Sequence, residues 1–408
     1  MNAQNNNQTS CAKLPITIIP PRYKVNNIYF TILFSVYLAI TLIDVLFSNI
    51  ILNLLPLILG SFALMLLSTR SRREYVRIYI FVGCLATFFL ISSLIVGRTG
   101  NRVYMPILFI VSSAGIAMIL IRGYVYSLGG YIAFYGLAVY FLMLMLAGVD
   151  TSVMGGRNAI SIAVLIACIT LYIILSGENK KLDLKPALVT LFISIWSVGR
   201  SGIASSVVLL LGLLFVRFRA KIYILSMIIY MIIYLINPYQ FQDALFEFIM
   251  EHSFFANPYY YYLKNKINIV NMQRWIFWSH YFNNLDIFRL IFGFNLLEDP
   301  SFVGPGFDLN YHNSFIHLHL QTGFMGLITM ALILFALYKY YKTNIVFFFL
   351  MLSFILRAST DLFIFFNHAD FILFFFIFYL LRNFGLRVPY ISPLLAGSRE
   401  MRSYPDRR

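Results

Sequence analysis

The sequence predicts an all-helical membrane protein that crosses the bilayer about twelve times. Of its 408 residues, 60% are hydrophobic and only 12% are charged, whereas about 25% of the residues of a soluble protein are charged. The apolar residues come in blocks of roughly 14–22, about the length that a helix needs to cross a hydrocarbon core. These blocks are apolar on every side and lack the polar face of a surface helix.

We expect twelve spans, which follow directly from the apolar blocks. They cover residues 28–48, 50–68, 78–97, 103–121, 129–148, 159–176, 186–199, 202–216, 222–237, 316–338, 345–359 and 361–381. The chain then divides into a polar N-terminal tail, a nine-span membrane region, one large loop, three C-terminal spans and a basic C-terminal tail. These five regions cover residues 1–27, 28–237, 238–315, 316–381 and 382–408.

The distribution of Lys and Arg predicts that both termini lie in the cytoplasm. With the N-terminus inside, 22 of the 31 basic residues fall in tails and loops that face the cytoplasm, and this is the bias that orients membrane helices. The loop 238–311 then faces outward with four basic and seven acidic residues. Topology and contact with anionic lipid account for the net charge of +15, so we expect no nucleic-acid partner.

Motifs for nucleotide, serine-hydrolase and zinc chemistry are absent from the sequence. We find no P-loop, no Gly-x-Ser-x-Gly elbow and no His-Glu-x-x-His. His317 and His319 point to different sides of a helix, and His312 and His319 share a face but lie about 10 Å apart along it. We therefore expect no metal site and no cofactor, and we expect helix-end histidines with satisfied ring nitrogens.

Arginines on the outward-facing side need an explanation, because the orientation bias removes most basic residues from that side. Three of them fit ordinary solvated loop charges: Arg98, Arg102 and Arg157. Arg200 differs, because it lies in Ser197-Val198-Gly199-Arg200-Ser201-Gly202, a small-residue break between two short apolar runs. Such a break is typical of a re-entrant hairpin or a pair of half-helices with a buried turn. Arg200 then needs an anionic partner, either Asp44 or Asp361 or a substrate phosphate.

The long loop holds other residues with candidate chemistry. Arg274 lies near the start of residues 271–284, whose apolar positions at helical spacing predict an amphipathic helix on the membrane, and Arg289 follows it. Tyr311-His312-Asn313-Ser314 precedes the tenth span and supplies an Asn or Ser cap for it. Arginine binds phosphate bidentately, and histidine can accept a proton from a hydroxyl. These residues suit attack of a hydroxyl on a carbon that carries a diphosphate leaving group.

The last two spans carry ionisable residues within or beside apolar blocks. Arg357 and Asp361 are four residues apart, so we expect them to pair at the outer face. We expect His368 and Asp370 inside the last helix, about 10–14 Å farther in. Such groups are candidates for function, and the alternative is a buried pair with Arg or Tyr of a neighbouring span. The candidate substrate-binding residues are Arg289, Asn313, Arg357, Asp361 and Asp370.

At these residues the sequence resembles the superfamily of O-antigen polymerases and O-antigen ligases, which are bacterial envelope glycosyltransferases. The matching features are Gly199-Arg200-Ser201-Gly202 at a span break, Arg274 early in the external loop, and a signature at the loop end. That signature reads His312-Asn313-Ser314-Phe315, followed by Gln321-Thr322-Gly323-Phe324-Met325-Gly326-Leu327. The resemblance covers about residues 186–340, and the earlier spans resemble the family only in being apolar membrane spans.

The resemblance implies an integral inner-membrane enzyme that takes glycan from undecaprenyl diphosphate on the periplasmic side without a metal. It implies that Arg200 and Arg274 bind the diphosphate and that His312 acts on the acceptor hydroxyl. The high Phe, Tyr, Ile and Asn content is associated with polymerase genes, so a polymerase is favoured over a ligase that transfers the chain to lipid A–core. A chain-length regulator is the candidate protein partner. A flippase or other transporter is the alternative from another class, but no first-half segment matches the long loop, as repeated halves would require.

Overall fold

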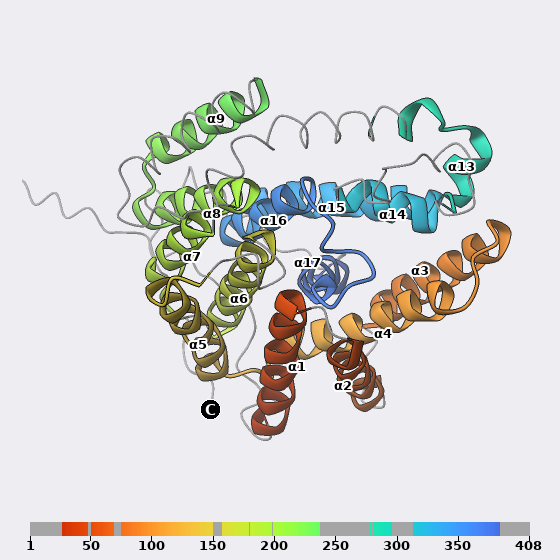
Figure 1. Cartoon of the computed structure of the whole chain (residues 1–408), viewed down its shortest axis with the longest axis horizontal. Coiled ribbons are helices and arrows are strands. Elements are labelled where there is room, and N and C mark those ends of the chain that lie inside the picture. The colour runs from red at the N-terminus through yellow and green to blue at the C-terminus, as the bar shows by residue number, and fades with distance from the viewer. Residues whose placement is uncertain are drawn as a thin grey trace, which may run out of the picture.

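The computed structural model describes most of the membrane region and part of the long loop. The described residues are 27–47, 50–68, 75–149, 157–178, 180–197, 199–236, 278, 281–295 and 313–383. Nearly all of both predicted tails, most of the predicted loop 238–315, and with it Arg274 and His312, lie outside these ranges. Every regular element named within the ranges is a helix (Figure 1). Among the described residues, seven helices are long and apolar enough to cross a membrane, which confirms a polytopic helical membrane protein.

The first nine helices lie within three residues of the predicted spans at each end. They are α1 (Asn27–Phe47), α2 (Ile50–Ser68), α3 (Val76–Ile95), α4 (Asn101–Ile121), α5 (Ser127–Leu146), α6 (Arg157–Gly177), α7 (Lys185–Trp196), α8 (Arg200–Phe218) and α9 (Lys221–Ile236). α7 ends at Trp196 and α8 begins at Arg200, and the two helices pack against each other. At 12 residues α7 is too short to span a bilayer, whereas α8 is long enough, so the expectation of two short half-helices is wrong for α8.

The C-terminal part differs more from the predicted spans. It contains α13 (Ile287–Phe292), α14 (Ser314–Thr322), α15 (Phe324–Thr343), α16 (Ile345–Ala358) and α17 (Asp370–Asn383). The predicted tenth span 316–338 is divided at Gly323, whose φ of 54° ends α14 before α15 begins. The predicted twelfth span 361–381 is too long at its start, because α17 begins only at Asp370.

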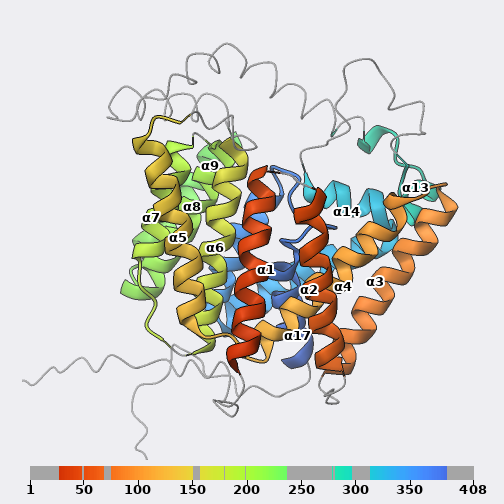
Figure 2. The ribbon, with the colours of Figure 1, turned by 60° about the horizontal axis from the view of Figure 1, so that its bottom comes forward.

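Two helices form the centre of the bundle. The membrane-spanning length of α6 is completely buried, because α6 contacts α1, α5, α7, α8, α16 and α17. Figure 1 shows α17 end-on between α1, α6 and the row formed by α15 and α16. Figure 2 shows the helices side by side, with α13 and α14 near one end of the bundle. Exposed apolar side chains lie on outer helices, for example Leu94 of α3 and Ile132 of α5, which are 68% and 65% exposed, as expected for helices in a bilayer.

The segment 359–369 between α16 and α17 is irregular, although its apolar sequence predicts helix. The Asp370 carboxylate accepts hydrogen bonds from the backbone N–H groups of Phe365, Phe366 and Asn367 at 2.6, 2.7 and 3.1 Å. It thereby folds the preceding chain back onto the start of α17. His368 lies in this segment and is 1% exposed, so its predicted place inside a helix is wrong.

Candidate functional site

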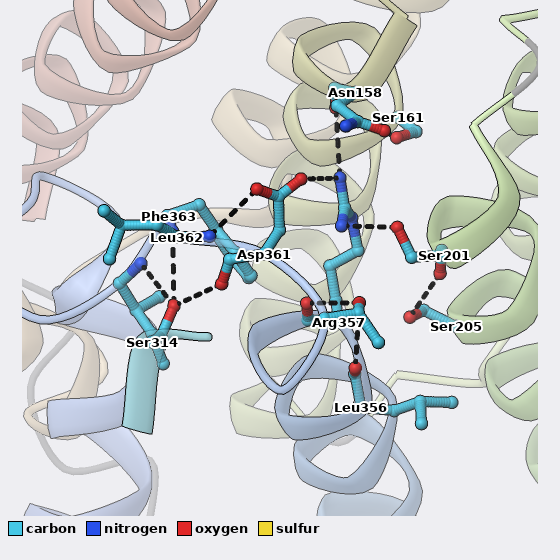
Figure 3. A network of polar contacts seen from close by, with 12 residues as sticks. Asn158, Ser161, Ser201, Ser205, Ser314, Leu356, Arg357, Asp361, Leu362 and Phe363 are labelled. Atoms are coloured by element: carbon cyan, nitrogen blue, oxygen red, sulfur yellow. Dashed lines mark hydrogen bonds and ion pairs between the residues drawn. The ribbon is translucent and has the colours of Figure 1, made fainter. Parts of the chain in front are cut away.

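A buried network around Arg357 joins four segments that lie far apart in the sequence (Figure 3). Arg357 belongs to the last turn of α16 and is fully buried. Its guanidinium donates to Ser201 Oγ of α8 at 2.6 Å and to the Asn158 carbonyl of α6 at 3.4 Å. It also pairs with the Asp361 carboxylate at 3.2 Å, so the predicted Arg357–Asp361 pair is confirmed. A buried arginine requires such a partner, because an isolated charge is costly to remove from water.

The same network reaches the start of α14 through Ser314. Ser314 Oγ donates to the Asp361 carbonyl at 2.7 Å and accepts from the Phe363 N–H at 3.2 Å. The Asp361 carboxylate also accepts from the Leu362 N–H at 2.9 Å. The beginning of α14 is therefore attached to the turn that follows α16, about one helical turn from Arg357.

Local sequence explains why helices begin at this place. Asn313 caps α14, because its side-chain oxygen accepts from the N–H groups of Phe315 and Ile316 at 2.9 and 3.1 Å, which satisfies two donors that a helix start leaves unpaired. The predicted cap is thus present. Gly199 precedes α8 and has an extended backbone with ψ of 93°, so the chain turns directly into Arg200.

Close packing of α8 on α6 depends on Gly202. A Cβ at this position would lie 2.4 Å from the Ser161 Cβ and 2.6 Å from its Oγ, which is closer than atoms in proteins approach. The Gly-Arg-Ser-Gly sequence therefore needs its second glycine to bring the start of α8 against α6. Small residues at contacts between membrane helices commonly serve this purpose.

Gly202→Ala is expected to lower thermal stability and activity together, because the new methyl group pushes the start of α8 away from α6. Ser161→Gly removes both clashing atoms, and the backbone atom that remains nearest to the new methyl group lies at an ordinary distance of 3.7 Å. The double variant should therefore recover most of what Gly202→Ala loses, as a double-mutant cycle of melting temperatures would measure. Equal losses in the single and double variants would contradict this close approach of the two helices.

The network lies where positive charge accumulates. The starts of α6, α8 and α14 each carry a partial positive charge of about half an elementary unit, and all three contact the Arg357–Asp361 pair or its turn. Arg157 and Arg200 are the first residues of α6 and α8, and their side chains lie outside the description. Such surroundings favour an anionic group.

The remaining predicted site residues lie apart from this network or outside the description. Arg289 of α13 donates to the Asn284 carbonyl at 2.8 Å and lies 3.9 Å from Asp286, at the end of α14 opposite to Asn313. The Asp370 carboxylate accepts hydrogen bonds from the three backbone amides described above. Arg274 and His312 lie outside the described residues, and no partner is assigned to the Arg200 side chain.

Arg98 is a buried structural residue, so its interpretation as a solvated loop charge is wrong. It is 5% exposed and donates to the carbonyls of Leu320 and Phe294 at 2.6 Å each and to that of Gln321 at 2.9 Å. Burial lowers the pKa of Arg98 to about 10, so the side chain remains charged at neutral pH. It satisfies the last carbonyls of α14, which have no partner within the helix. Arg102, by contrast, is exposed as predicted.

The segment 281–295 packs tightly against the same end of α14. The Leu290 carbonyl can only accept, so His319 Nε2 donates to it at 3.0 Å. His319 Nδ1 then accepts from the Tyr281 hydroxyl at 2.6 Å, and burial raises the pKa of Tyr281 so that this hydroxyl stays protonated. A Cβ at Gly293 would lie 2.2 Å from the Leu320 carbonyl oxygen. Both ring nitrogens of His319 are satisfied, as the sequence predicts.

No group of three His, Cys, Asp or Glu residues that could hold a metal occurs among the described residues. The arrangement places three helix starts around the paired Arg357 and Asp361, and helix starts suit binding of an anion. Comparisons with protein-family models, curated proteins and solved structures give no match.

Proposed function

We propose that the protein is an O-antigen polymerase that joins oligosaccharide repeat units carried on undecaprenyl diphosphate. The proposal places it in the bacterial inner membrane with twelve spans, both termini in the cytoplasm and the loop 238–315 in the periplasm. The observation that carries it is the joining of Gly199-Arg200-Ser201-Gly202 and Asn313-Ser314 by the Arg357–Asp361 pair. These two motifs also carry the resemblance to the polymerases and ligases.

In the proposed reaction, an acceptor hydroxyl attacks the anomeric carbon of the donor glycan. A new glycosidic C–O bond forms, the bond from that carbon to the diphosphate oxygen breaks, and the diphosphate departs with the electron pair. Arg200 and Arg274 neutralise the departing diphosphate, and His312 accepts the proton of the hydroxyl. With these roles for the two arginines and the histidine, the reaction needs no metal and no nucleotide, because the donor carries its own activated leaving group.

We assign a positioning role to Arg357, because its side chain is fully buried. It connects the start of α8, whose first residue is Arg200, through Asp361 to Ser314 at the start of α14. His312 directly precedes the Asn313 cap of α14. The predicted contacts of substrate with Asn313, Asp361, Asp370 and Arg289 remain predictions.

A lipopolysaccharide gel of a deletion strain tests the proposal. The strain should show core that carries a single repeat, and the wild-type gene should restore the ladder. Arg200→Ala, Arg274→Ala and His312→Ala should fail to restore it at normal expression, whereas the exposed Arg102→Ala should succeed. Bare core with long chains on the lipid carrier would identify a ligase instead. Bare core with single repeats that stay on the cytoplasmic side of the carrier pool would identify a flippase.

A further inference from the structure

The segment 281–292 carries large apolar side chains that the described protein does not cover. Its outer apolar face consists of Phe282, Ile287, Phe288 and Ile291, which are between 43% and 77% exposed. In α13 the spacing of three and four residues places Ile291 on the same side as Ile287 and Phe288, and Phe282 precedes the helix in the chain. A contiguous exposed patch of this kind usually contacts a membrane or another protein.

This face cannot turn inward, because the opposite side of the segment is fixed to α14. Tyr281 is 5% exposed, stacks on Phe294 at 5.7 Å and is hydrogen-bonded to His319. The Leu290 carbonyl accepts from the same histidine. The outward direction of the apolar face is therefore set by contacts on the inner side.

The outer apolar face lies beside the exposed apolar surface of a helix that is long enough to span a membrane. α13 contacts α3, and both views show it beside the end of that helix (Figures 1 and 2). α3 is a membrane-length helix, and its end exposes Ile91, Leu94 and Ile95 by 43–68%. The apolar surface of the bundle thus continues from α3 toward α13.

The charged groups of α13 set how deep such a segment can lie. Asp286 caps the helix by accepting from the Arg289 N–H at 2.7 Å, and its side chain is 61% exposed. A helix with one apolar side and a charged, solvated cap is typical of the boundary between headgroups and acyl chains.

We propose that α13 and Phe282 lie in the bilayer interface, with the outer apolar face among the lipid acyl chains. The segment 281–295 is then held at the membrane surface by lipid, and it is held to α14 by Tyr281 and Arg98. The occupant of this face is bilayer lipid, because the face continues the lipid-facing surface of α3. The proposal does not depend on the proposed enzymatic function.

Spin-label accessibility tests this position in the full-length chain, made cysteine-free by Cys11→Ser, Cys84→Ala and Cys168→Ala and reconstituted in phosphatidylethanolamine–phosphatidylglycerol vesicles. A nitroxide is attached to the new cysteine of the Phe288→Cys variant or of the Ile291→Cys variant. If one of these variants does not fold, the other still supplies the measurement. Leu94→Cys is the lipid reference, and the exposed Arg102→Cys is the aqueous reference. Collision rates with oxygen, which concentrates in hydrocarbon, and with a water-soluble nickel chelate are compared.

The ratio of oxygen to nickel collisions at residues 288 and 291 should exceed the ratio at Arg102→Cys and approach that at Leu94→Cys. A ratio equal to the aqueous reference would place the face in water and overturn the proposal. Low collision rates with both reagents would show that protein covers the face, and this result would also overturn it.

Discussion

Replacing Arg357 with alanine is expected to abolish the proposed polymer formation and to destabilise the protein by about 3–5 kcal/mol, the usual cost of removing one partner of a buried ion pair. Arg357 is fully buried and donates to Ser201, Asn158 and Asp361. Its loss leaves the Asp361 carboxylate without this cation and removes the hydrogen bond from the last turn of α16 to Ser201 at the start of α8. Thermal unfolding of the purified protein in detergent measures the loss of stability, and the lipopolysaccharide ladder measures the loss of polymer.

The double variant Arg357→Ala/Asp361→Ala separates stability from positioning. Removing both charges eliminates the uncompensated carboxylate, so the double variant should regain much of the lost stability. It should remain inactive, because the hydrogen bond that joins Ser201 to the last turn of α16 is lost. A double variant that recovers stability and activity together would show that Arg357 serves stability alone. A single variant with normal stability would contradict the network itself.

Arg98→Ala is expected to destabilise the protein by on the order of 3 kcal/mol, because three carbonyls lose charge-assisted hydrogen bonds in a buried position. Two of these carbonyls belong to the last turn of α14 and the third to Phe294. The change should also loosen the segment 281–295, so its amide hydrogens should exchange faster with deuterium. Unfolding temperature and hydrogen exchange measured by mass spectrometry check these two effects.

Two arginine variants provide the comparison for Arg98→Ala. Arg98→Lys keeps the charge but lacks the planar guanidinium group that reaches the three carbonyls. It should therefore recover only part of the stability. Arg102→Ala lies in the next helix, removes the same charge and side-chain type from an exposed position, and should leave stability unchanged. Similar unfolding temperatures for Arg98→Ala and Arg102→Ala would contradict the capping of α14 by Arg98.

The fold could be predicted from the sequence wherever one apolar block forms one helix. The first nine blocks do so, since long apolar runs must satisfy their backbone groups internally within a membrane. The prediction failed at residues 316–338 and 361–381, where the apolar run continues through a change of backbone direction. At Gly323 the segment 291–293 approaches so closely that a Cβ would lie 2.0 Å from the Ile291 carbonyl oxygen. At Asp370 a side chain takes backbone amides that a helix would otherwise use.

The candidate site was predictable in part, and the type of partner explains the difference. Arg357 and Asp361 are close in sequence, and Asn313 caps a helix that begins at the next residue, so local spacing identified both contacts. Arg98 was missed because its partners are backbone carbonyls more than 190 residues away, and no side-chain pattern marks them. The network residue Ser201 carried a signal through its small-residue motif, whereas the carbonyl of Asn158 carried none.

The purified protein offers the most direct test of the proposed polymerase activity. Reconstituted with undecaprenyl-diphosphate-linked repeat units and no metal or nucleotide, it should release undecaprenyl diphosphate and form lipid-linked glycans of two or more repeats. His312→Ala and Arg200→Ala should fold normally and form neither product. Unchanged repeats in the wild-type reaction, or full activity in both variants, would contradict the account.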